Sequence, residues 1–220
     1  MKRYKYILFD LDGTLTDPEE GITKSIAHGL EKMGMENIDL KSLRKFIGPP
    51  LRDSFMKYYN FDEEETKKAI ELQREYFRAK GKFENIVYEG IEELLKTLKG
   101  KDYILAVATS KPEVFAVEIL EHFGLKDYFT FIGGSLLDGN RTKKADVIKY
   151  VMESLEIVEE KSQIIMIGDR EHDIIGAKAN GIDSIGVRYG FAEGEELQEA
   201  GATYILNRVE DLKRFFDNFS

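Results

Sequence analysis

The sequence predicts an α/β fold, with a parallel sheet covered by helices and a helical segment inserted after the first strand. Short apolar runs without polar alternation recur along the chain, which is typical of strands buried on both faces of a parallel sheet. Segments with the apolar spacing of amphipathic helices lie between these runs, and this alternation is typical of right-handed crossovers. The 220 residues fit one domain with an insert, since about 150 residues per domain is usual.

Three apolar runs predict the central strands, and each run ends in polar residues. They are YKYILFD at 4–10, YILAVATS at 103–110 and QIIMIGD at 163–169. Further strands are expected at 129–132, 184–187 and 204–206. Helices of the same domain are expected at 89–98, 112–123, 143–155, 174–180 and 209–216.

One segment, residues 17–84, breaks the alternation because it contains helical patterns and no strand-like run. Helices are expected there at 18–33, 40–46, 50–59 and 62–80. Asp62 followed by Glu65 matches a capping box at the start of the last helix. We therefore predict two domains: an α/β core formed by 1–16 plus 84–220, and a helical cap formed by 17–83.

Composition and charge exclude several functional classes. The net charge of −9 disfavours a nucleic acid polymer as partner, because phosphate contacts need a basic face. The absence of cysteine excludes disulfide scaffolds, thiolate metal sites and cysteine nucleophiles. No apolar run approaches the roughly 18–20 residues that span a membrane, and the N-terminal residues do not resemble a signal peptide. We expect a cytoplasmic protein with no membrane partner.

Polar side chains follow three of the predicted strands where each strand ends. Because ligands bind at the carboxyl ends of parallel strands, we expect these side chains to share one site. Clustered carboxylates repel each other unless a cation lies among them, and an all-oxygen ligand set favours Mg²⁺. The candidate side chains are Asp10, Asp12, Thr109, Ser110, Asp169 and Asp173.

These residues resemble a known family. FDLDGTL at 9–15 is similar to the first signature of the haloacid dehalogenase-like phosphohydrolases, and Thr109 matches the second. Lys144 matches the third signature and GDREHD at 168–173 the fourth, so the resemblance covers essentially the whole chain. It implies a Rossmann-like parallel-sheet core, and the insert resembles the family's type-I helical cap. FIGPPL at 46–51 and GVRYG at 186–190 point to the phosphoglycolate phosphatase and bacterial 5′-nucleotidase-like group.

The resemblance and the chemistry of carboxylates together give roles to the first two acids. Asp10 would attack phosphorus and form an aspartyl-phosphate, which divides hydrolysis into two displacements. Asp12 would protonate the leaving oxygen and then accept a proton from the attacking water. Gly13 allows the sharp turn that follows the strand. An acid at position 12 favours phosphoryl transfer over dehalogenation, which needs no leaving-group acid.

The resemblance also implies a metal site. The Asp10 carboxylate, the Asp12 backbone carbonyl and Asp169 would hold Mg²⁺, and Asp173 would support it. A carboxylate nucleophile facing a phosphate dianion is strongly repelled without such a cation.

Three residues are expected to bind phosphate. Thr109 would donate a hydrogen bond to a phosphoryl oxygen, and Lys144 would pair with the phosphate and the nucleophile. Ser110 donates to phosphate or caps the helix that follows, and both interpretations stay open. Of the adjacent lysines we choose Lys144 and interpret Lys143 as solvated. Lys111 is interpreted as a solvated loop residue.

The predicted cap offers candidate substrate contacts after a Gly-Pro-Pro break. They are Gly48, Pro49 and Arg52, since a cation at position 52 would suit a second anionic group of the substrate. The alternative for Arg52 is an ordinary surface position on a helix. Tyr58 and Tyr59 are interpreted as cap core, with base stacking as the alternative.

The function predicted from these observations is Mg²⁺-dependent hydrolysis of a small phosphorylated metabolite. A nucleoside 5′-monophosphate is the first substrate expected and phosphoglycolate the second, both from the resemblance. The alternatives are a phosphomutase of the β-phosphoglucomutase type, which hands the phosphoryl group to a sugar phosphate, and a non-catalytic, phosphate-switched binding module. We expect a monomer or a weak homodimer.

Overall fold

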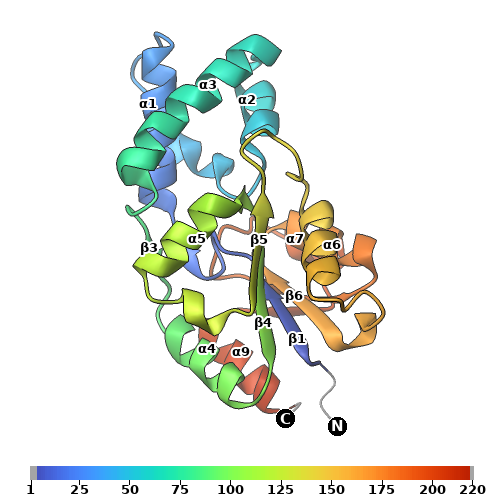
Figure 1. Cartoon of the computed structure of the whole chain (residues 1–220). Coiled ribbons are helices and arrows are strands. Elements are labelled where there is room, and N and C mark those ends of the chain that lie inside the picture. Colours follow the sequence, from blue (N-terminus) through green and yellow to red (C-terminus); the bar gives the residue numbers. More distant parts are fainter. Residues whose placement is uncertain (1–3, 219–220) are drawn as a thin grey trace. The chain divides into compact units, whose positions relative to one another are not determined.

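The computed structural model describes residues 4–218 and divides the chain into two compact units (Figure 1). One unit combines Met1–Asp17 with Val87–Ser220, and the other is Pro18–Ile86. The sequence-based boundaries at 16/17 and 83/84 fall one and three residues before these. Residues 1–3 and 219–220, which belong to the predicted core domain, lie outside the described residues.

The first unit contains a six-stranded sheet in the order β5-β4-β1-β6-β7-β8. All neighbouring strands pair in parallel, which confirms the predicted α/β class with a parallel sheet. The strands are β1 (Tyr6–Phe9), β4 (Ile104–Pro112), β5 (Phe131–Ser135), β6 (Ile164–Gly168), β7 (Asp183–Val187) and β8 (Tyr204–Leu206). Because β1 lies between β4 and β6, the three predicted polar strand ends are neighbours.

Helices cover both faces of this sheet (Figure 1). One face packs against α6 (Lys144–Ser154) and α7 (Glu171–Asn180), through a core that includes Leu8, Val147 and Met166. The other side carries α4 (Ile91–Gly100), α5 (Glu113–His122) and α9 (Val209–Asp217). The central strands are buried on both faces, which is why their sequences show no polar alternation.

Short elements of the first unit lie outside the sequence-based predictions. They are α8 (Glu196–Ala200), 3₁₀ turns at Lys126–Tyr128 and Lys161–Gln163, and the strand β2 (Thr16–Asp17), which pairs with β3 (Ile86–Val87) at the boundary between the units. Such elements carry too few residues to produce a periodic pattern. In the part of the chain that the structure describes, no helix has the length and apolarity needed to cross a membrane.

The second unit is helical, as expected for the predicted cap. It contains α1 (Glu19–Lys32), a 3₁₀ helix at Leu40–Phe46, α2 (Leu51–Tyr59) and α3 (Glu63–Tyr76). The Asp62–Glu65 capping box is confirmed, with both reciprocal hydrogen bonds present. The predicted helix 62–80 ends earlier, because a π-helical turn occupies Phe77–Gly81. The backbones are close there, since a Cβ at Gly21 would lie 1.9 Å from the carbonyl oxygen of Gly81.

Candidate active site

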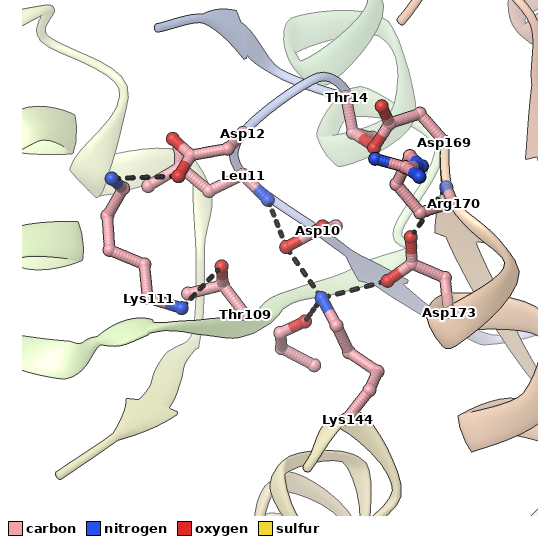
Figure 2. A network of polar contacts seen from close by, with 11 residues as sticks. Asp10, Leu11, Asp12, Thr14, Thr109, Lys111, Lys144, Asp169, Arg170 and Asp173 are labelled. Atoms are coloured by element: carbon pink, nitrogen blue, oxygen red, sulfur yellow. Dashed lines mark hydrogen bonds and ion pairs between the residues drawn. The ribbon is translucent and has the colours of Figure 1, made fainter. Parts of the chain in front are cut away.

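Buried polar side chains gather at the carboxyl ends of β4, β1 and β6. Asp10 follows β1, Thr109 lies in β4 and Asp169 follows β6, and each is at most 4% exposed. Lys144 and Asp173 reach the same place from the first turns of α6 and α7. Figure 2 shows these side chains converging. The structure thus brings together the candidate residues that the sequence placed on separate strands.

Lys144 is the centre of this group. Its Nζ lies 2.7 Å from Asp10 Oδ1 and 2.8 Å from Asp173 Oδ1, and it donates to the Ala108 carbonyl at 3.2 Å. Burial lowers the pKa of Lys144, but the charges of Asp10 and Asp173 outweigh burial and raise it above its ordinary value. Lys143 is exposed at the start of the same helix. A permanently charged lysine therefore lies against the candidate nucleophile.

Asp169 is fully buried and tightly enclosed. Its Oδ2 accepts a hydrogen bond from the Phe191 backbone N–H at 2.7 Å. Gly13 and Gly190 pack so closely that a Cβ on either would lie 2.5 Å or less from a carboxylate atom of Asp169 or from backbone. Burial, together with the charges of Asp173 and Asp10, raises the pKa of Asp169 well above its ordinary value.

Asp10, Asp169 and Asp173 can hold a metal ion. Each offers one carboxylate oxygen, and these oxygens lie within 4.8 Å of one another. Burial raises the pKa of Asp173 to about 6; the charge of Lys144 opposes this rise and that of Asp10 adds to it. With Asp12 and its lysine partner included, four carboxylates face two lysines, and when all four are ionised 2 − 4 leaves a formal charge of −2. An all-oxygen donor set with two uncompensated negative charges fits a hard divalent cation.

Asp12 makes a second buried ion pair beside this group. Its Oδ2 lies 2.7 Å from Lys111 Nζ, and the two side chains are 11% and 6% exposed. The interpretation of Lys111 as a solvated residue was therefore wrong. Burial raises the pKa of Asp12, and the charge of Lys111 opposes that rise. Asp12 Oδ1 is buried and has no hydrogen-bond partner among the described residues.

A bulge in β4 explains why Lys111 is buried. Ala108 pairs with Gly133 and Pro112 with Ser135, so residues 109–111 face the single residue Gly134 of β5. Bulges of this kind redirect side chains and are common next to active sites. Within the bulge the Thr109 hydroxyl accepts a hydrogen bond from the Lys111 backbone N–H at 3.3 Å, and Ser110 is half-buried.

The loop after β7 contributes residues that the sequence reasoning missed. The Tyr189 hydroxyl donates to the Thr14 carbonyl at 2.8 Å, and Phe191 donates to Asp169. Burial and the nearby charge of Asp169 raise the pKa of Tyr189 well above its ordinary value, so it stays a hydrogen-bond donor. Gly190, three residues after the predicted strand 184–187, was the available signal, because a glycine often marks a close backbone approach.

The candidate substrate contacts Gly48, Pro49 and Arg52 lie in the other unit, Pro18–Ile86. Gly48 and Pro49 are half-buried. Arg52 is exposed and forms ion pairs with Glu63 and with Asp53. This arrangement matches the alternative interpretation of Arg52 as a helix-surface residue.

Tyr58 and Tyr59 pack within the helical unit. Their ring centroids lie 5.7 Å and 6.0 Å from that of Phe46, whose centroid is 5.0 Å from that of Phe55. These contacts agree with their interpretation as cap core.

Comparison with known proteins identifies relatives over nearly the full chain. A 5′-nucleotidase of Pseudomonas aeruginosa is 46% identical over 98% of this chain and 97% of its own. The tyrosine-protein kinase PtkA of Mycobacterium tuberculosis is 35% identical over 94% of this chain and 70% of its own. A phosphoglycolate phosphatase of Colwellia psychrerythraea is 29% identical over 96% of each chain.

A solved structure agrees with these relatives. The crystal structure of a predicted phosphatase from Clostridium acetobutylicum is 57% identical, with a TM-score of 0.93 over 97% of this chain and 99% of its own. The family model described as haloacid dehalogenase-like hydrolase matches residues 7–187, which include all four signatures. The chain therefore belongs to the haloacid dehalogenase-like hydrolase family and is an enzyme of its phosphatase type.

Proposed function

We propose that this phosphatase hydrolyses small phosphomonoesters with Mg²⁺ through an aspartyl-phosphate at Asp10. The observation that carries the proposal is the contact of Asp10 with Lys144, 2.7 Å apart and buried among two further carboxylates. A structural ion pair needs one carboxylate for one lysine. The additional acids serve a ligand that carries positive charge.

Asp10 is held ready for attack on phosphorus. One of its oxygens, Oδ1, accepts a hydrogen bond from the Leu11 backbone N–H at 2.8 Å and contacts Lys144. In the first step Asp10 bonds to phosphorus and the ester oxygen leaves. In the second step water attacks the same phosphorus and frees the Asp10 carboxylate. Lys144 stabilises the negative charge that the phosphoryl group brings next to Asp10.

Asp12 serves as the acid and base. It gives a proton to the leaving oxygen in the first step and takes one from water in the second, and such a group typically contributes ~10²–10⁴-fold. Burial raises the pKa of Asp12, and the charge of the paired Lys111 opposes that rise. Thr109, at the end of the buried part of β4, provides a hydroxyl donor for a phosphoryl oxygen.

The proposed metal ligands are Asp10, Asp169, Asp173 and the Asp12 backbone carbonyl. When bound, Mg²⁺ offsets the repulsion between the carboxylates and the phosphate dianion. The closeness of Gly13 and Gly190 to Asp169 and the Phe191 hydrogen bond keep that carboxylate in one orientation.

A nucleoside 5′-monophosphate is the first substrate proposed, supported by the 46% identity to a 5′-nucleotidase. Phosphoglycolate is the second, supported by the more distant phosphoglycolate phosphatase. In this proposal the helical unit Pro18–Ile86 acts as the cap that selects the substrate, and the enzyme works as a monomer or weak homodimer in the cytoplasm.

The test is phosphate release from a panel of phosphomonoesters, with Mg²⁺ and with a chelator. The panel contains nucleoside 5′-monophosphates, phosphoglycolate, sugar phosphates and p-nitrophenyl phosphate. We expect Mg²⁺-dependent release, fastest with a nucleoside 5′-monophosphate, and none in Asp10→Asn. Release that persists in chelator or in Asp10→Asn would overturn the proposed mechanism, and preference for another member of the panel would replace the proposed substrate.

A further inference from the structure

We propose that Lys111 is a positioning residue for Asp12: it holds the acid's carboxylate apart from the Asp10–Lys144 pair. The proposal rests on the proposed function, since it concerns how the acid of that reaction is oriented. The sequence predicts that Lys111 is solvated, whereas its side chain is buried in the structure.

The contact between Lys111 and Asp12 is more buried than the lysine–carboxylate pairs on the surface of the molecule. Lys111 Nζ lies 2.7 Å from Asp12 Oδ2, with side chains 6% and 11% exposed. Lys24 and Glu20, by comparison, form a pair that is 36% and 61% exposed. Burying a lysine is costly unless it is paired, and a buried pair is weak as a stabilising device. A buried pair next to the reacting group therefore calls for a functional explanation.

The backbone around Lys111 is built to keep it in place. The bulge at 109–111 needs Gly134 opposite, because a Cβ there would lie 2.6 Å from the Lys111 carbonyl oxygen. Glu113 Oε2 accepts hydrogen bonds from the Gly134 N–H at 3.2 Å and from Arg141 at 3.1 Å. Arg141 also donates to the Gly134 carbonyl at 2.8 Å. These contacts fix the β5 residue opposite the bulge and the chain just after it, so the direction of the Lys111 side chain does not depend on Asp12 alone.

The arrangement gives each of the two catalytic carboxylates its own lysine. Figure 2 shows Lys144 between Asp10 and Asp173, and Lys111 on the other side of Asp12. Lys144 is the other lysine whose charge acts on the buried Asp12 carboxylate. Without Lys111, Asp12 would compete with Asp10 for Lys144. Lys111 prevents this, and it leaves Asp12 Oδ1, which has no hydrogen-bond partner among the described residues, available to the leaving group.

The dependence of rate on the leaving group tests this role. Hydrolysis of p-nitrophenyl phosphate needs little acid assistance, because p-nitrophenolate is a good leaving group, whereas a nucleoside 5′-monophosphate expels a poor one. We expect Lys111→Met to lower kcat for the nucleotide by roughly 10- to 100-fold, part of the usual contribution of an acid. The loss for p-nitrophenyl phosphate should stay within about threefold. Lys143→Met, which removes the exposed neighbour of Lys144, should leave both rates unchanged.

A double variant distinguishes a loss of Asp12 positioning from a folding defect caused by an unpaired buried charge. Asp12→Asn combined with Lys111→Met removes both charges of the pair and leaves no buried unpaired ion. If Lys111 acts only through Asp12, this double variant should have the same kcat for the nucleotide as Asp12→Asn alone, because coupled residues are not additive.

Two results would overturn the proposal. One is an equal loss of kcat for both substrates in Lys111→Met, which points to a structural role or to direct phosphate binding. The other is a further loss of about tenfold or more when Lys111→Met is added to Asp12→Asn. Failure of the proposed function is separate, because it appears as absence of Mg²⁺-dependent phosphate release in the unsubstituted enzyme.

Discussion

The edge of the sheet and the helical unit Pro18–Ile86 differ in whether their charged side chains are buried. At the sheet edge, Asp10, Lys144 and Asp173 are at most 5% exposed, and Lys144 contacts both acids. In the helical unit, by contrast, the ion pair of Arg52 with Glu63 is exposed on both sides. Its interior contains an aromatic cluster around Phe46 and Phe55, and its buried polar contacts include the neutral hydrogen bond from Gln73 to Ser25.

This difference separates the sources of stability and of chemistry. Buried ions cost more in desolvation than their attraction returns, so they are weak stabilisers. Buried aromatic rings are strong ones. Substitutions at the sheet edge should therefore change activity most, and substitutions in the helical core should change stability most.

The largest effect is expected for Asp10→Asn. Removing a covalent nucleophile lowers kcat by at least ~10⁴-fold, the scale at which loss of such a residue is felt in other hydrolases. Phosphate release under saturating substrate measures the loss, and the far-ultraviolet circular dichroism spectrum checks that the fold is kept. Full turnover in this variant would remove Asp10 from the mechanism.

Phe55→Ala should have the next largest effect, on stability. Phe55 is fully buried and contacts Phe46, Tyr59 and Phe61. Truncating a buried phenylalanine costs about 3–5 kcal/mol, and urea denaturation measures the change. Phe55→Leu, which fills more of the space, should lose less. A loss below about 1 kcal/mol for Phe55→Ala would break the comparison, because the cluster would then not be the core of its unit.

Asp169→Asn should stabilise the metal-free protein. The folded-state pKa of Asp169 is raised, by burial first and then by Asp173 and Asp10, so ionising it destabilises the fold as the pH rises above its unfolded value of about 3.9. In chelator, the Tm of Asp169→Asn minus that of the unsubstituted protein should be near zero at pH 4 and grow toward neutral pH. The scale is about 2–4 °C for each kcal/mol.

Adding Mg²⁺ sharpens the same experiment. The cation should raise the Tm of the unsubstituted protein at neutral pH and have a smaller effect on Asp169→Asn, since a ligand stabilises the state that binds it. A Tm difference that shrinks with rising pH, or an equal response to Mg²⁺, would contradict the assignment of Asp169 to a repulsive, metal-binding cluster.

Arg52→Gln should have the smallest effect. Arg52 is 53% exposed and its pairs with Glu63 and Asp53 lie at the surface of the helical unit, where an ion pair contributes about 0.2–1 kcal/mol. Urea denaturation at low and high salt measures it. A loss above about 2 kcal/mol would show that charge also stabilises this unit.

Much of the fold follows from local patterns. The runs that form β1, β4 and β6 are apolar throughout because helices cover both faces of the sheet. The polar residues at the ends of these runs predicted which edge of the sheet carries the site. Helix spacing supports the choice of Lys144 over Lys143, because Lys144 shares its face with the buried Val147, Ile148 and Val151. Capping signals such as Asp62 with Glu65 marked a helix start correctly.

Other features depend on contacts between distant segments. The burial of Lys111 follows from a bulge that forms where β4 pairs with β5 opposite Gly134. The sequence of β4 alone does not predict that pairing. The π-helical turn at Phe77–Gly81 likewise accompanies the close approach of Gly21 to Gly81. The hydrogen bond from Phe191 to Asp169 joins residues 22 positions apart, so no periodic pattern predicts it.

Detection of the phosphoryl group on Asp10 tests the central claim most directly. The enzyme would be acid-quenched during turnover of its best substrate with Mg²⁺, and the peptide that contains Asp10 analysed by mass spectrometry. We expect one phosphoryl group on Asp10 that depends on substrate and is absent from Asp10→Asn. Continued turnover with Asp10 unmodified, or with the phosphoryl group on another residue, would contradict the proposed mechanism.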